Sequence, residues 1–172
     1  MTAGPLDLNL LPQTSKVVDG RLVIGGCDVI ELTERFGTPV FVYDEQHLID
    51  RCSEAVRAFP DGVAYASKAF LCKAMAKIAH EAGMSIDVAT GGELIVALAA
   101  GVPSERLVFH GNNKSLPELR MAMEEGVGTI VIDSFDEMDR IESLVSLGSE
   151  PPTVLIRLNP GIEAHTHEYL QT

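Results

Sequence analysis

The sequence predicts an α/β protein whose core is a parallel sheet, organised either as a (β/α)8 barrel or as a doubly wound sheet. From residue 44 onward, short apolar runs alternate with helical patterns, and the centres of these runs lie about 22 residues apart. The runs are almost continuously apolar, as is typical of strands that are covered on both faces. No G-x-G-x-x-G pattern follows the first strand, which weakens the dinucleotide-binding alternative. About five strands can be counted where a barrel needs eight, so we expect the chain to be part of a longer protein.

The helix boundaries support this register. Glycines close the expected helices, at positions where a left-handed backbone costs least without a Cβ. Three helix starts fit the capping box, namely Thr90 with Glu93, Ser115 with Glu118, and Ser134 with Glu137. The expected strands are 62–67, 85–90, 106–111, 129–134 and 153–159, and the expected helices are 44–59, 71–83, 91–101, 115–126 and 134–148.

The N-terminal residues follow a different pattern. Residues 1–16 contain prolines and are expected to form an irregular arm. A hairpin follows, because two apolar runs flank the turn dipeptide Asp19-Gly20. A short helix is expected at 27–37 and a short strand at 40–43. The predicted regions are an arm with a β segment, 1–36, and the first part of the repeating βα region, 37–172.

The composition limits the possible classes of function. The chain has 172 residues, 46% hydrophobic and 22% charged, as is usual for a soluble globular protein. The formal net charge of −12 argues against a nucleic-acid partner, which needs a basic surface. The sequence has neither a bilayer-length apolar run nor a signal-peptide pattern, so we expect a cytoplasmic protein with no membrane partner. Cys27, Cys52 and Cys72 predict neither a disulfide framework nor a zinc site.

Polar and ionisable residues gather where the expected strands end. Along the five strands they are Lys68, Asp87, His110, Asp133 and Arg157. The carboxyl ends of parallel strands meet at one edge of the sheet, and in a barrel that edge carries the active site. We therefore expect the functional site there.

Lys68 is the sharpest candidate, because lysine is unusual directly after a buried apolar run. In a barrel mouth, desolvation would lower the pKa of its amine and prepare it for Schiff-base chemistry. The alternative, which position alone favours, is a solvated lysine at a strand end. Arg157 lies in an apolar strand and needs a partner. That partner is either a structural carboxylate, Asp133 or Asp87, or an oxygen of a ligand.

The loops between strands and helices offer further candidates, each with a structural alternative. Gly91-Gly92 either lets an anion approach a helix start or simply forms a tight turn. Asn112 and Asn113 can hydrogen-bond a polar substrate and Lys114 can pair with an anion, unless this block is only an asparagine-rich turn.

Two histidines near the end of the sequence lie two residues apart. The spacing of His165 and His167 occurs in some metal sites, but no matching cluster lies near them in sequence. We therefore expect no metal and place both in an active-site loop.

Five stretches of the sequence resemble the diaminopimelate decarboxylase family, a branch of the fold-type III pyridoxal-phosphate-dependent decarboxylases. They are GTPVFVYD at 37–44, YASKAFLC at 65–72, DVATGGEL at 87–94, FHGNNKS at 109–115 and RLNPGIEAHTHEYLQT at 157–172. The resemblance covers roughly residues 19–172. YASKA occurs in several related decarboxylases, whereas HGNNKS and EAHTHEYLQT are more specific to this branch.

The resemblance implies a fold, a cofactor and site residues. The fold is a partial (β/α)8 barrel of the alanine-racemase-like type, with an early β segment at about 17–36 that belongs to a second β-domain. The cofactor is pyridoxal 5′-phosphate. Lys68 matches the family's Schiff-base lysine, and Arg157 matches the arginine near the cofactor's phenolic oxygen. Further implied residues are Asp87, His110 and Asn112 on the cofactor, and Asn113, Lys114, His165 and His167 on the substrate side.

The implied reaction is decarboxylation of meso-2,6-diaminopimelate to L-lysine and carbon dioxide, by a homodimer. The family's glycine-rich phosphate loop and its dimer-contributed residues have no counterpart in this sequence, so we expect the 172-residue chain alone to be inactive. Three alternatives stay open. They are another fold-type III decarboxylase acting on arginine, ornithine or carboxynorspermidine, a non-catalytic pyridoxal-phosphate-binding barrel, and a purely structural α/β domain.

Overall fold

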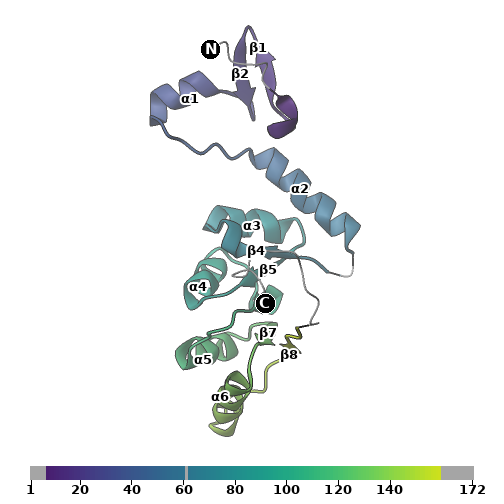
Figure 1. The fold of residues 1–172 in the computed structure, drawn as a ribbon, viewed down its shortest axis with the longest axis vertical. Coiled ribbons are helices and arrows are strands. Elements are labelled where there is room, and N and C mark those ends of the chain that lie inside the picture. The colour runs from purple at the N-terminus through teal and green to yellow at the C-terminus, as the bar shows by residue number, and fades with distance from the viewer. Residues whose placement is uncertain (1–6, 61, 160–172) are drawn as a thin grey trace. The chain divides into compact units, whose positions relative to one another are not determined.

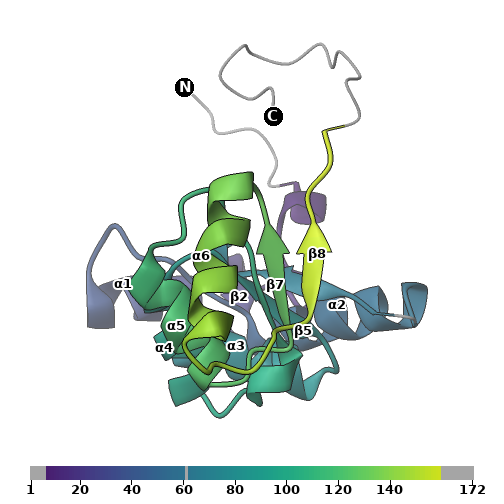
Figure 2. The ribbon, with the colours of Figure 1, turned by 90° about the horizontal axis from the view of Figure 1, so that it is seen from below.

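The computed structural model describes residues 7–60 and 62–159, which form the elements drawn in Figures 1 and 2. The chain divides into two compact units. They are residues up to Val63 with Glu81–Gly83, and Ala64–His80 with the residues from Met84 onward. This division does not coincide with the predicted boundary between residues 36 and 37. The helix at Glu45–Ala58 belongs to the same unit as the N-terminal segment. That residues 1–36 belong to a second β-domain of a longer protein stays a prediction.

The first unit begins with a three-stranded antiparallel sheet in the order β1-β2-β3. Its elements are η1 (Leu8–Leu10), β1 (Lys16–Val18), β2 (Arg21–Ile24), β3 (Cys27–Asp28), α1 (Val29–Phe36) and α2 (Glu45–Ala58). The predicted hairpin is confirmed, since β1 and β2 pair across Asp19-Gly20. Both turn residues have positive φ angles, 50° and 77°, the geometry for which Asp-Gly is favoured in two-residue hairpin turns.

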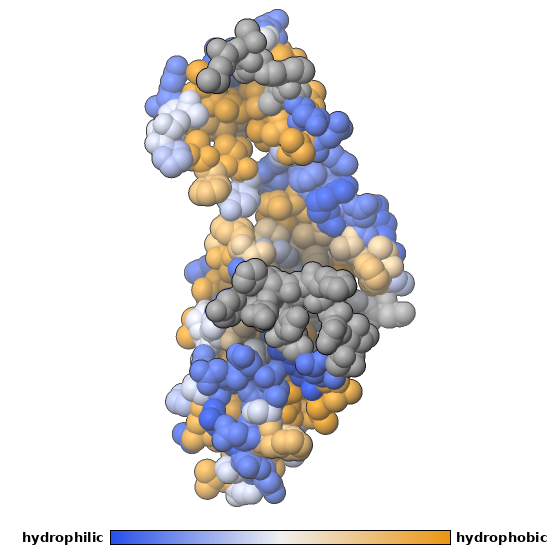
Figure 3. Space-filling view, viewed as in Figure 1, coloured by the Kyte–Doolittle hydropathy of each residue, from blue (hydrophilic) through white to orange (hydrophobic). Residues whose placement is uncertain are grey.

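Residues 40–43 were expected to form a strand, and this expectation is wrong: the described backbone forms no strand there. All four of these residues are exposed, Phe41 the most, and so are Val17 and Phe36 elsewhere in the unit. Figure 3 shows the resulting apolar surface on this part of the chain.

Among the helices of residues 7–60 and 62–159, none combines the length and the apolarity needed to cross a membrane.

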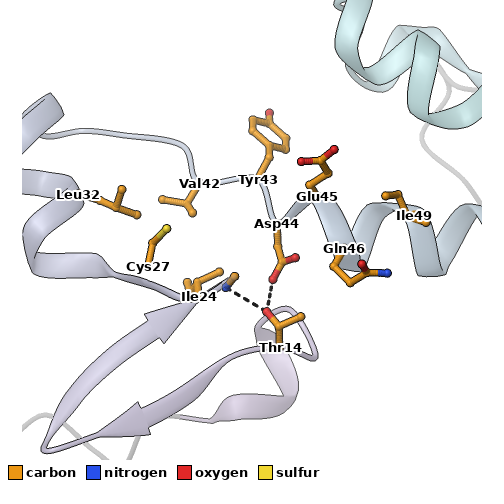
Figure 4. A pocket seen from close by; sticks show the side chains of 11 residues that line it. Thr14, Ile24, Cys27, Leu32, Val42, Tyr43, Asp44, Glu45, Gln46 and Ile49 are labelled. Atoms are coloured by element: carbon orange, nitrogen blue, oxygen red, sulfur yellow. Dashed lines mark hydrogen bonds between the residues drawn. The ribbon is translucent and has the colours of Figure 1, made fainter.

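A hollow of about 610 Å³ lies between the hairpin, α1 and the start of α2 (Figure 4). Asp44, which lines it, is buried and caps α2 by accepting a hydrogen bond from the His47 amide at 3.0 Å. The Thr14 hydroxyl donates to the same carboxylate and accepts from the Gly25 amide at 3.1 Å. These bonds, the one from Thr14 most, hold the pKa of Asp44 below its ordinary value. The Asp44 carboxylate thus links the segments around Thr14 and Gly25 to the start of α2. We place no functional site in this hollow.

The second unit is the predicted α/β region, and its five parallel strands follow one another in sequence order, β4-β5-β6-β7-β8. Its elements are β4 (Ala64–Ala66), η2 (Ser67–Ala69), α3 (Lys73–Glu81), β5 (Ser85–Val88), α4 (Gly91–Ala99), η3 (Ser104–Arg106), β6 (Leu107–Phe109), α5 (Leu116–Glu124), β7 (Thr129–Ile132), α6 (Phe135–Ser146) and β8 (Val154–Ile156). Each strand and helix predicted from residue 62 onward is confirmed, with shorter ends. Figures 1 and 2 show α4, α5 and α6 on the same side of the sheet.

The sheet has one buried face and one that is partly accessible. Side chains alternate along a strand, and Ile86, Val88 and Ile130 on the helix-covered face are fully buried. Strand register places the intervening residues together on the opposite face. We call this second set the open face; it consists of Ala64, Ala66, Ser85, Asp87, Val108, Thr129, Val131 and Leu155.

The three predicted capping boxes are realised differently. Ser115 and Glu118 form the full reciprocal box at the start of α5. At α4 and α6 the hydroxyl half is present, but the carboxylate reaches one residue further back. Glu93 accepts from the Ala89 amide at 2.6 Å, and Glu137 accepts from the amide of Asp133 at 3.0 Å. Both carboxylates therefore bind the backbone where a strand ends.

Glu118 also joins two neighbouring βα units, because its second oxygen accepts from the Gly91 amide at 2.8 Å. The bond from Gly91, followed by those from Ser115, holds the pKa of the Glu118 carboxyl below its ordinary value of 4.5. A carboxyl whose pKa is lowered on folding stabilises the fold above its unfolded pKa, and this contribution is lost as pH falls through the folded pKa.

We therefore expect Glu118→Gln to lower the free energy of unfolding by about 1–2 kcal/mol at neutral pH. Urea unfolding of variant and wild type at neutral pH and at several values below 4.5 checks this. The difference should shrink towards acid, because the wild-type carboxyl becomes protonated as well. A difference that stays constant across this range would contradict the ionic origin of the contribution.

Candidate functional site

Lys68 stands at the carboxyl end of β4, within the short η2 turn, as the sequence predicted. Its side chain is exposed in the described structure. The expected desolvation of its amine is therefore not provided by the residues described here. Ala64 and Ala66 precede it on the open face and are small, which leaves space on the sheet beside the lysine.

Asp87 and His110 form the first polar pair of the site. Asp87 lies in β5 on the open face, and His110 follows β6, the neighbouring strand. Nδ1 of His110 is hydrogen-bonded to Oδ1 of Asp87, and both side chains are half-buried. A carboxylate acceptor favours the proton on Nδ1, which leaves Nε2 as the nitrogen that can serve another group.

Asp133 and Arg157 form the second pair, one strand further along. Asp133 follows β7 and Arg157 follows β8, and Nη1 lies 3.1 Å from Oδ1. Of the two carboxylates that the sequence offered as partners for Arg157, the structure selects Asp133. The arginine side chain is 42% exposed. A guanidinium has five N–H donors, so the cation can still bind an anionic oxygen.

These residues gather at one edge of the sheet. Five consecutive parallel strands each contribute one ionisable residue at or beside the carboxyl end, in the order Lys68, Asp87, His110, Asp133 and Arg157. The site therefore offers an amine, a carboxylate–imidazole pair and a carboxylate–guanidinium pair. Such a set can bind an anionic ligand and move protons.

Lys114 has a different role from the one expected on the substrate side. The residue is only 1% exposed. Its Nζ forms an ion pair with Glu137 at 2.9 Å and donates to the carbonyl oxygens of Gly111 and Val131 at 2.6 and 2.7 Å. All three donors of the ammonium group are used inside the protein, so we assign Lys114 to the framework of the site.

The remaining loop candidates differ in their settings. Asn112 and Asn113 are exposed between β6 and α5. The amide of Gly91 donates to the Glu118 carboxylate. This carboxylate therefore occupies the position at the start of α4 where an anionic ligand was expected. Gly91-Gly92 is therefore better explained as a tight turn packed against a neighbouring helix. His165 and His167 lie outside the described residues.

Sequence reasoning missed Glu137 as a part of the site. Its spacing from Ser134 predicted only a helix cap, and that spacing is the sole local signal it gives. The contact with Lys114 joins residues 23 positions apart on different elements, which a local pattern does not reveal. Glu137 is 4% exposed, so the pair is almost fully removed from water.

Comparisons with known proteins agree on one family. Residues 45–172 match the family model described as "Pyridoxal-dependent decarboxylase, pyridoxal binding domain". The chain is 48% identical over 158 residues to the diaminopimelate decarboxylase of Halalkalibacterium halodurans, covering 89% of this chain and 36% of that protein. The chain thus spans little more than a third of that relative's length.

Solved structures give the same result. The diaminopimelate decarboxylase of M. jannaschii in complex with L-lysine aligns with a TM-score of 0.82 at 35% identity, over 88% of this chain and 37% of that chain. A lysine/ornithine decarboxylase from Vibrio vulnificus, complexed with putrescine, aligns with a TM-score of 0.65 at 26% identity, over 76% of this chain and 35% of that chain. The family model covers most of the sequence, and the chain therefore belongs to the pyridoxal-dependent decarboxylases, to whose pyridoxal binding domain residues 45–172 correspond.

Proposed function

We propose that the full protein carrying this chain decarboxylates meso-2,6-diaminopimelate to L-lysine and carbon dioxide with pyridoxal 5′-phosphate. The observation that carries the proposal is the row of ionisable residues, headed by Lys68, along the carboxyl ends of five consecutive strands. The 48% identity to a relative named diaminopimelate decarboxylase supports this choice of substrate.

The four βα units and the fifth strand, β8, are the first part of a (β/α)8 barrel in this proposal. A doubly wound sheet reverses its strand order and carries helices on both faces, whereas here the order is sequential and α4, α5 and α6 share one side. All three residues of β8 are exposed, although they are apolar. An eight-stranded barrel would cover this strand with its next neighbour. The protein would act in the cytoplasm as a homodimer, with residues 1–36 in a second β-domain.

The side chains of the site fit the cofactor. Lys68 supplies an exposed primary amine, the group that binds an aldehyde covalently. Arg157 supplies a partly exposed cation that can bind an anionic oxygen, and the Asp87–His110 pair supplies further polar groups at the same edge of the sheet. Asn112 is a further exposed donor at the same edge. When bound, pyridoxal phosphate provides an electron sink for the pair left behind by carbon dioxide.

The residues of this chain would then orient the reactants and move protons. Lys68 would hold the cofactor through its amine and would carry a proton on Nζ for the reacting carbon. Asp87 fixes the ring and the tautomer of His110, and Asp133 holds Arg157 in place. Asn113, His165 and His167 are proposed on the substrate side.

The test of this proposal is a substrate panel with the purified full protein and pyridoxal phosphate. Meso-diaminopimelate, ornithine, arginine and carboxynorspermidine are supplied separately, and carbon dioxide and the amine products are measured. We expect lysine from meso-diaminopimelate and little turnover of the others. Preferred turnover of another amino acid would select a different decarboxylase, and cofactor binding without turnover would select the non-catalytic alternative. The isolated 172-residue chain is expected to be inactive.

A further inference from the structure

We propose that Lys114 and Glu137 form a positioning pair that sets the geometry between the two polar pairs of the candidate site. The inference deepens the proposed function and rests on it for its kinetic test. In this proposal neither side chain contacts the substrate or the cofactor. The pair acts through the backbone that carries His110 and Asp133.

Lys114 fixes the loop that follows β6. Its Nζ donates to the carbonyl of Gly111 at 2.6 Å and to that of Val131 in β7 at 2.7 Å. Gly111 has a φ of +114°, which L side chains rarely adopt, and a Cβ there would lie 3.1 Å from the carbonyl oxygen of Ala89. Because Gly111 directly follows His110, the buried amine determines the path by which the chain leaves the histidine.

Glu137 fixes the end of β7. One carboxylate oxygen lies 2.9 Å from Nζ of Lys114, and the other accepts the amide of Asp133 at 3.0 Å. Asp133 in turn holds Arg157 at 3.1 Å. A single carboxylate thus contacts both the cation that anchors the histidine loop and the residue that orients the arginine.

The arrangement serves geometry better than stability. Removing two charges from water costs about as much as their attraction returns, and apolar residues of similar volume often stabilise a protein equally well. An ammonium group, by contrast, donates in three fixed directions, and here two carbonyls and a carboxylate accept. A displacement of catalytic groups by about 1 Å can lower the reaction rate on the order of a hundredfold. A rigid link between the two polar pairs would therefore preserve the rate.

The experiment uses the full protein loaded with pyridoxal phosphate and compares Lys114→Met, Glu137→Met and the double variant. Each single variant should lower kcat by about 10–100-fold, leave KM close to wild type, and alter the visible circular dichroism of the bound cofactor. The double variant should recover much of the lost stability, because no uncompensated charge stays buried. It should not recover kcat, and recovery of kcat would overturn the proposal.

The matched control is Leu119→Ala, a fully buried apolar residue of α5 that is not bonded to the pair. It should destabilise the protein while kcat and the circular dichroism stay near wild type. An equal loss of kcat in this control would mean that the pair affects kcat only through the stability of the fold, and would overturn the proposal. Glu137→Gln keeps the shape, folds most readily, and should lose kcat to an intermediate degree; wild-type kcat in this variant would also contradict the proposal.

A second readout does not need activity. In cofactor-free protein with ¹⁵N-labelled histidine, the imidazole signals of His110, identified by their loss in His110→Gln, should shift in Lys114→Met but not in Leu119→Ala. Unchanged His110 signals in Lys114→Met would overturn the positioning role. If the wild type turns over no amino acid in the panel, the proposed function fails, and this measurement still decides the role of the pair.

Discussion

Lys68→Ala should remove covalent attachment of pyridoxal phosphate and lower kcat by at least about a hundredfold, the lower limit of what a positioned proton-transfer group contributes. Alanine has no amine to bind the aldehyde or to hold a proton near the reacting carbon. The side chain is exposed at the end of β4, so its loss should leave the stability of the fold nearly unchanged. Borohydride reduction of the loaded full protein, followed by peptide mass mapping, locates the adduct, and carbon dioxide release gives the rate.

Two variants separate the amine from the charge of Lys68. Lys68→Arg keeps the positive charge but replaces the amine by a guanidinium that stays protonated, so it should also lose the adduct and the activity. Lys73→Ala removes an exposed lysine of the following helix and should behave as wild type. An adduct that persists in Lys68→Ala, or that maps to another lysine in the wild type, would refute the assignment of Lys68.

The βα register was predictable from sequence because it depends on local signals. Hydroxyls at Thr90, Ser115 and Ser134 cap their helices as expected, and glycines close several helices with positive φ angles. Each signal acts within a few residues, so a single sequence contains it in full. The row of ionisable residues at the strand ends followed from that register, since parallel strands end at a common edge.

The roles of particular side chains were less predictable, because they depend on contacts between distant residues. Lys114 lies in a polar loop and was expected to face a ligand, yet it is buried against Glu137 and Val131. The sequence around Gly91 left its amide available to an anion, whereas in the structure this amide donates to Glu118 of the next helix. The partner of Arg157 was limited to two carboxylates by sequence and decided only by the pairing of β7 with β8.

Gly128→Ala should be among the most destabilising small substitutions in the chain. Gly128 precedes β7, and its amide donates to the carbonyl of Ser104 at 3.0 Å. A Cβ at this position would lie 2.1 Å from the carbonyl oxygen of Glu105 and 2.7 Å from its carbonyl carbon. Both atoms belong to backbone, so no rotamer change relieves the clash. We expect a loss of about 3 kcal/mol in the free energy of unfolding, the upper end of the usual cost of overpacking.

The matched control is Gly148→Ala, at the end of α6. Gly148 has a φ of +104° but nothing within 4 Å of its ideal Cβ, so only backbone strain of about 1–2 kcal/mol opposes the alanine. Urea unfolding of both variants compares steric clash with strain. A smaller loss for Gly128→Ala than for Gly148→Ala would contradict the close backbone approach. The comparison bears on the site, because Glu105 and Gly128 lie just before β6 and β7, the strands that His110 and Asp133 follow.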